Sequence, residues 1–134
     1  MSNLYEDVAT KVYDNLIADI YPPTEVFAVT IRKVAGEVVT LKRGTVLAVS
    51  SGTAGDGKMV VLGNTAGSNE TLTANCILAE DVEVGTSVDT TALAYRTGHF
   101  QQNNLIVKDE YTLSAADKEA LRNVGILLSE SMEY

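Results

Sequence analysis

Cysteine and histidine are almost missing from this sequence of 134 residues, which has one of each, Cys76 and His99. A single cysteine excludes an intrachain disulfide and a zinc site built from cysteines. A single histidine excludes the usual metal sites that use several imidazoles. The sequence therefore lacks the ligands of the common structural metal sites.

Acidic side chains are the other possible metal ligands. The pairs Glu80-Asp81 and Asp109-Glu110 are the candidates, but neither lies in an alternating Asp/Asn loop that ends in glutamate. We interpret both pairs as solvated strand ends, and we expect neither a metal nor any other cofactor.

Basic residues and long apolar runs are also scarce. Lysine and arginine total 10 against 18 acidic residues, which gives a net charge of −8 and argues against binding to nucleic acid. No apolar run approaches the roughly 20 residues that cross a bilayer, and the N-terminus lacks the order of a signal peptide. With 46% hydrophobic residues, the chain is expected to fold as one domain in a cytosol.

The first 24 residues differ in pattern from the rest. Apolar residues there recur at spacings of one, three and four, which predicts an amphipathic helix over residues 4–20; they are Leu4, Tyr5, Val8, Val12, Tyr13, Leu16, Ile17 and Ile20. Pro22 and Pro23 end this pattern. We predict an N-terminal arm at residues 1–24 and a β-rich domain at residues 25–134.

The apolar face of this arm has several possible uses. It could cover one end of the β-rich domain, dock onto a partner or pack against other copies of the chain. Membrane attachment is disfavoured, because the polar face has four acidic residues and a single base, Lys11.

After the prolines the period of the apolar residues changes to two. Phe27, Val29 and Ile31 alternate with smaller or polar residues, and further short strands are predicted in "RGTVLAV", "KMVVLG", "NCILAEDVEV" and "TTALAYRTG". The glycine-rich "SSGTAGDGK" is predicted to join two of them. We expect a mainly β fold with a small sandwich or barrel-like body.

One further helix is predicted late in the chain. Ser114 is suited to its N-cap, Asp117 to its first turn and Arg122 to its last, and Gly125 ends it. Leu121 and Val124 are expected to face the body. The apolar "ILL" that follows predicts a closing strand.

Catalysis has few candidates in this sequence. His99 could act as a general base beside Arg96, or pair with Cys76, but Cys76 lies in the apolar "NCILA" and is expected to be buried. We interpret Gly98 and His99 as a turn between two strands, with Phe100 packed beneath it and "NNLIV" as the second strand. "GDGK" is followed by Met59 and strand-like residues, so it fails as a phosphate-binding loop. We expect neither an enzyme nor a small-molecule substrate.

Taken in order, the segments "TLKRGTVLAVSS", "GKMVVLG", "ILAEDVEV" and "ALAYRTGHFQQNNLIV" resemble the lambda-type head decoration proteins of tailed bacteriophages. The resemblance extends over residues 38–130, including the late helix and closing strand. It implies a small, largely β protein that trimerises on the outside of the expanded capsid and clamps capsid subunits against the pressure of packaged DNA. It also implies an extended N-terminal arm that adds to a sheet of the capsid protein, whereas residues 4–20 here have a helical pattern.

Our leading hypothesis is therefore a head decoration (cement) protein: a homotrimer that binds the major capsid protein, in the host cytoplasm before assembly and on the virion afterwards. We expect the capsid-contact face of the arm to consist of Leu4, Tyr5, Val8, Val12, Tyr13, Leu16 and Ile17. The alternatives are another virion component, such as a head-fibre base, head–tail joining or tail-tube protein, or a small β-barrel enzyme or ligand-binding module around Arg96 and His99.

Overall fold

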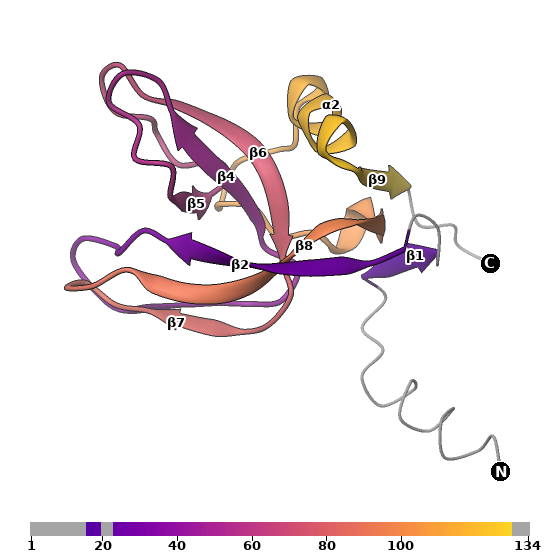
Figure 1. Cartoon of the computed structure of the whole chain (residues 1–134), viewed down its shortest axis with the longest axis horizontal. Coiled ribbons are helices and arrows are strands. Elements are labelled where there is room, and N and C mark those ends of the chain that lie inside the picture. Colours follow the sequence, from indigo (N-terminus) through magenta and orange to yellow (C-terminus); the bar gives the residue numbers. More distant parts are fainter. Residues whose placement is uncertain (1–15, 20–22, 130–134) are drawn as a thin grey trace, which may run out of the picture.

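The computed structural model describes residues 16–19 and 23–129. Its elements, shown in Figure 1, follow the order β1 (Ile17–Asp19), β2 (Glu25–Ile31), β3 (Val39–Leu41), β4 (Val46–Ser51), β5 (Met59–Val61), β6 (Thr71–Leu78), β7 (Val82–Val84), β8 (Thr90–Gln101), a 3-10 turn (Gln102–Asn104), α2 (Ala115–Val124) and β9 (Ile126–Ser129). The prediction of a mainly β fold with a barrel-like body and a late helix is confirmed.

The body is a small barrel formed by β2, β5, β4, β6 and β8, which pair in that order and close through β8 and β2. Neighbouring strands are antiparallel except at β2 and β5, which meet in parallel at Ile31 and Met59. The short pair β3–β7 packs beside the barrel, and Val84 of β7 is buried in the same core as Leu47 of the barrel. Closure pairs most strand edges within the chain, which removes sites for unwanted strand addition.

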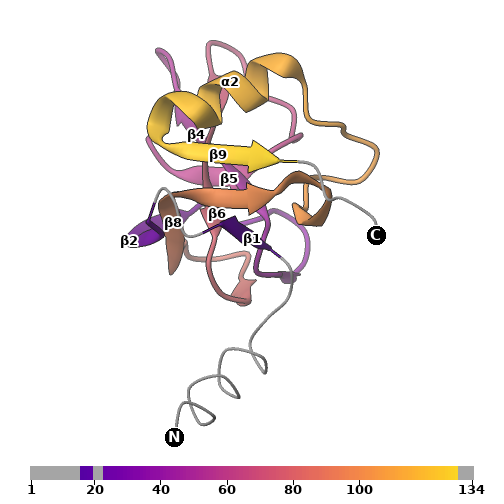
Figure 2. The same ribbon diagram turned by 90° about the vertical axis from the view of Figure 1, so that its right-hand side faces the viewer.

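The long strand β8 leaves the barrel at its C-terminal end and enters a second, smaller sheet. There it pairs antiparallel with β1 and parallel with β9, at Phe100 and its neighbours. Figure 2 shows α2 crossing above β9, with β8 and β1 in turn below it. This sheet is where the first and last described segments meet.

At β4 the barrel wall is buried on both faces, which explains the continuous apolar run in this strand. Leu47 belongs to a core inside the barrel, while Val46 and Ala48 face a second core beneath α2 and β9. Leu121 of α2, Ile126 of β9 and Phe100 of β8 are all fully buried in that second core. The helix is therefore held by packing on the outside of the barrel.

Local signals define α2 as predicted. The Ser114 hydroxyl accepts a hydrogen bond from the Asp117 amide, the Asp117 carboxylate accepts one from the Ser114 amide, and Gly125 is left-handed at φ 108°. Leu121 faces the body as expected. The same expectation for Val124 was wrong, because its side chain is exposed.

The helix predicted over residues 4–20 is wrong at its C-terminal end. Ile17–Asp19 form β1, because pairing with β8 satisfies their backbone groups. Residues 1–15 and 20–22 lie outside the described residues, so the rest of that helix stays a prediction. The range predicted as an arm thus contains a strand of the body.

The turn predicted at Gly98 and His99 is also wrong. Both residues lie inside β8, which continues to Gln101, and the chain reverses later through the 3-10 turn. The following "NNLIV" forms no strand; it makes only an isolated bridge between Ile106 and Thr45. Phe100 packs in the core as expected.

Candidate functional site

The lone cysteine is not placed as a nucleophile. Cys76 is fully buried inside the barrel, where its Sγ lies 4.0 Å from the Sδ of Met59. Burial raises the pKa of its thiol to about 12, so the thiol stays protonated at neutral pH. The expectation of a buried, structural cysteine is confirmed.

Arg96 and His99 do not converge on a reaction centre. The Arg96 guanidinium lies over the ring of Phe27, 5.7 Å from its centroid. His99 stands in the small sheet, opposite Leu127 of β9. Within the described residues no hydrogen bond or ion pair joins the two side chains, so the geometry does not pair a base with an anion-binding group.

The glycine-rich loop that superficially resembles a phosphate cradle is a hairpin loop between β4 and β5, as predicted. Arg32 fixes it with a bidentate pair to Asp56, at 3.0 and 2.9 Å, and with a 2.5 Å contact to Glu70. The Ser50 hydroxyl donates to Glu70 as well. Asp56 of the loop is thus paired with Arg32 and stabilises the fold.

These contacts change the acidity of both carboxyl groups. Hydrogen bonds from Ser50, the Gly67 amide and Arg32 lower the pKa of Glu70 to about 2. The bidentate pair with Arg32 lowers the pKa of Asp56 to about 2. Both groups are therefore charged throughout the neutral range.

Of the two acidic pairs considered as metal ligands, Glu80-Asp81 accepts hydrogen bonds from backbone amides. Glu80 accepts a hydrogen bond from the Leu93 amide, and Asp81 accepts one from the Arg43 amide. Over residues 16–19 and 23–129, no group of three or more potential ligands is close enough to hold a metal ion. In the same part of the chain, none of the helices is long and apolar enough to cross a membrane.

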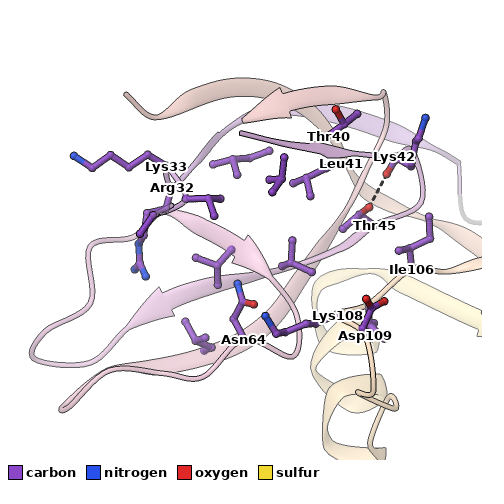
Figure 3. Close-up of a pocket in the computed structure, with 18 of the residues that line it drawn as sticks. Arg32, Lys33, Thr40, Leu41, Lys42, Thr45, Asn64, Ile106, Lys108 and Asp109 are labelled. Atoms are coloured by element: carbon purple, nitrogen blue, oxygen red, sulfur yellow. Dashed lines mark hydrogen bonds between the residues drawn. The ribbon is translucent and has the colours of Figure 1, made fainter. Parts of the chain in front are cut away.

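An open groove of about 730 Å³ runs between the β3 region and the barrel. Figure 3 shows Arg32 and Lys33 at one end of it, Thr45 and Ile106 at the other, and Lys108 beside Asn64. Buried Ile31 and Val60 contribute to its apolar floor. The groove has no paired acid and base, so its shape alone does not indicate a reaction.

The predicted contact residues of the arm are only partly placed. Leu4, Tyr5, Val8, Val12 and Tyr13 lie outside the described residues. Leu16 is 2% exposed and belongs to the core beneath α2, and Ile17 packs against that core. These two side chains therefore pack the Leu16–Ile17 segment against the body.

The point where the arm joins the body has a defined geometry. The Gln101 amide donates to the Leu16 carbonyl at 2.6 Å, and Ile17 stands opposite Phe100. The Thr97 hydroxyl donates to the carbonyl of Pro23, which fixes the chain again before β2. Leu16, the first described residue, thus lies at the end of the molecule that carries the small sheet.

Comparison with protein-family models shows a match over most of the chain. The model for the bacteriophage lambda head decoration protein D family matches residues 12–127. The match includes β1, the whole barrel, α2 and the start of β9. No curated protein matches the chain.

Proposed function

Because the chain belongs to the bacteriophage lambda head decoration protein D family, we propose that it binds the outer surface of a phage capsid as a homotrimer and stabilises the expanded head. The family match over most of the chain is the observation that carries this proposal. The partner would be the major capsid protein, and the work would be mechanical: holding neighbouring subunits together against the pressure of packaged DNA. We propose no catalytic activity, cofactor or nucleic-acid partner.

In this proposal the arm and the body have separate roles. Leu4, Tyr5, Val8, Val12 and Tyr13 would contact the capsid, while Leu16 and Ile17 anchor the arm to the body through the core beneath α2. The anchoring is supported by the burial of Leu16 and by the pairing of β1 with β8. A clamp needs such an anchor, because force on a contact is transmitted only through a fixed attachment.

Cosedimentation with expanded, undecorated capsids tests the proposed function. The full chain should pellet with the capsids and remain in the supernatant without them. A full chain that stays in the supernatant when capsids are present would refute capsid binding, whatever its oligomeric state.

Two truncations test the division between contact and anchor. Deletion of residues 1–15 should abolish cosedimentation while leaving the unfolding midpoint unchanged, because Leu16 and β1 remain. Deletion of residues 1–22 should in addition lower the free energy of unfolding by about 2–5 kcal/mol, the usual cost of losing a buried leucine. Normal decoration by the shorter truncation would remove the arm from the mechanism.

A further inference from the structure

The outer face of the β2–β8 ribbon has an unusual composition. Residues directly opposite each other on antiparallel strands share a face, and three successive pairs on the outside of the barrel carry no charge: Val26 with Tyr95, Ala28 with Leu93, and Thr30 with Thr91. We call these six residues the β2–β8 face. All six side chains are uncharged, on a chain in which 21% of the residues are charged.

The β2–β8 face is exposed although it continues a buried surface. Val26 and Leu93 are 50% and 44% exposed. Tyr95, in contrast, packs partly against the core beneath α2, on the same outer side of the barrel wall. The apolar surface that α2 covers thus extends past the helix and is left open to solvent.

Charge indicates what covers this face. Every copy of the chain has a net charge of −8, so two copies repel each other unless they meet where carboxylates are absent. None of the six side chains of the β2–β8 face is charged. Two charged groups of opposite sign border it: Glu80 accepts a hydrogen bond from the Leu93 amide, and the Arg43 guanidinium lies over the Tyr95 ring and donates to its hydroxyl. An uncharged centre with a polar rim is the usual anatomy of a protein interface.

The position of the face also separates it from the arm. Leu93 lies seven residues before Phe100 along β8, up to roughly 23 Å of strand. Phe100 is the residue that pairs with Ile17, at the end of the molecule from which the arm departs. A surface on the side of the barrel can therefore meet a neighbouring copy while the arm end meets another partner.

From these observations we propose that the β2–β8 face is the surface through which each copy of this chain contacts a second copy. This inference rests on the proposed homotrimer and deepens it by naming the contact face. In a closed three-fold ring every copy uses the face once, against the next copy. Leu93 would lie at its centre with Ala28, Val26 would lie beside them, and the threonines would supply uncharged hydrogen-bonding groups.

A carboxylate at the centre of the face tests the proposal. Leu93→Asp should raise the dissociation constant of self-association at least about 100-fold, because each contact would then bury an unpaired charge. Val26→Asp, on the facing strand, should act in the same way. Val88→Asp is the matched control: Val88 is 70% exposed, lies in the loop before β8 and is outside the face.

The measurement is the mass in solution by sedimentation equilibrium over a series of concentrations, with far-ultraviolet circular dichroism to confirm folding. The wild type and Val88→Asp should be trimers, and the two face variants should be folded monomers. A face variant that remains trimeric would overturn the proposal, even if it lost capsid binding, since the face would then serve the capsid. A wild-type chain that is monomeric at every concentration would also overturn it, while cosedimentation of that chain would leave capsid binding standing.

Discussion

Gly98 shows how one residue determines the course of the longest strand. Its φ of 149° lies in a region that L-residues rarely adopt, and a Cβ added there would lie 2.7 Å from two ring carbons of Phe100. Glycine at this position lets β8 continue past the barrel while the Phe100 ring folds back beneath it. Glycine is required at this position of β8 because any side chain there would clash with the buried Phe100 ring.

Substitution of this glycine should be costly. Gly98→Ala should lower the free energy of unfolding by about 2 kcal/mol, from backbone strain and the clash with Phe100. Chemical denaturation followed by circular dichroism measures this difference. Gly85→Ala is the control, because Gly85 has ordinary backbone angles and open space around its Cα; equal stability of both variants would contradict the packing role of Gly98.

The carboxyl group of Glu70 links stability to pH. Its pKa falls from 4.5 to about 2 in the folded chain, mainly through the hydrogen bond from Ser50. A carboxyl group with a lowered folded pKa stabilises the fold fully above its unfolded pKa, and this contribution is lost as pH falls through the folded value. The window for Glu70 is therefore from about pH 4.5 down to about pH 2.

Removal of this charge should remove part of that pH dependence. Glu70→Gln should be less stable than the wild type at pH 7, because Arg32 loses one of its two carboxylate partners, and the difference should shrink as pH approaches 2. Urea unfolding at pH 7, 4.5 and 2.5 measures both effects. Glu37→Gln, in the exposed segment before β3, is the control; a difference between Glu70→Gln and wild type that is constant over this range would argue against the linkage.

At the scale of elements, α2 could be predicted from the sequence because its signals are local. Ser114, Asp117 and Gly125 act within a few residues of one another, and the structure contains the capping box and left-handed stop that they predict. The barrel strands were also identifiable, since alternation such as Phe27, Val29 and Ile31 reports burial of one face. The β4–β5 hairpin loop followed from its glycines.

The elements that were wrongly predicted depend on distant partners. Leu16 and Ile17 fit a helical spacing, but the backbone here is fixed by pairing with Phe100 and its neighbours, far along the sequence. Gly98 resembles a turn glycine until β1 and β9 are known to flank it. The β2–β8 face could not be predicted for the same reason. Val26 and Leu93 are far apart in the sequence, and only the register of β2 and β8 shows that they lie on one surface.

For the whole molecule, the two proposed contact regions have complementary positions. Leu16 and β1 lie in the small sheet region, and the β2–β8 face lies on the side of the barrel. A trimer assembled through its sides would carry three arms that leave from equivalent ends. Each arm alone need bind the capsid only weakly, because linked sites raise overall affinity without new contacts.

This arrangement predicts that trimerisation itself strengthens decoration. Leu93→Asp, as a folded monomer with an intact arm, should need a protein concentration at least about 100-fold higher than the wild type for half-occupancy of expanded capsids, because the three arms are no longer linked. Val88→Asp, the trimeric control, should match the wild type. Cosedimentation across a concentration series measures both values. If the monomeric variant decorates capsids as tightly as the wild type, the arms act independently and avidity has no part in the attachment.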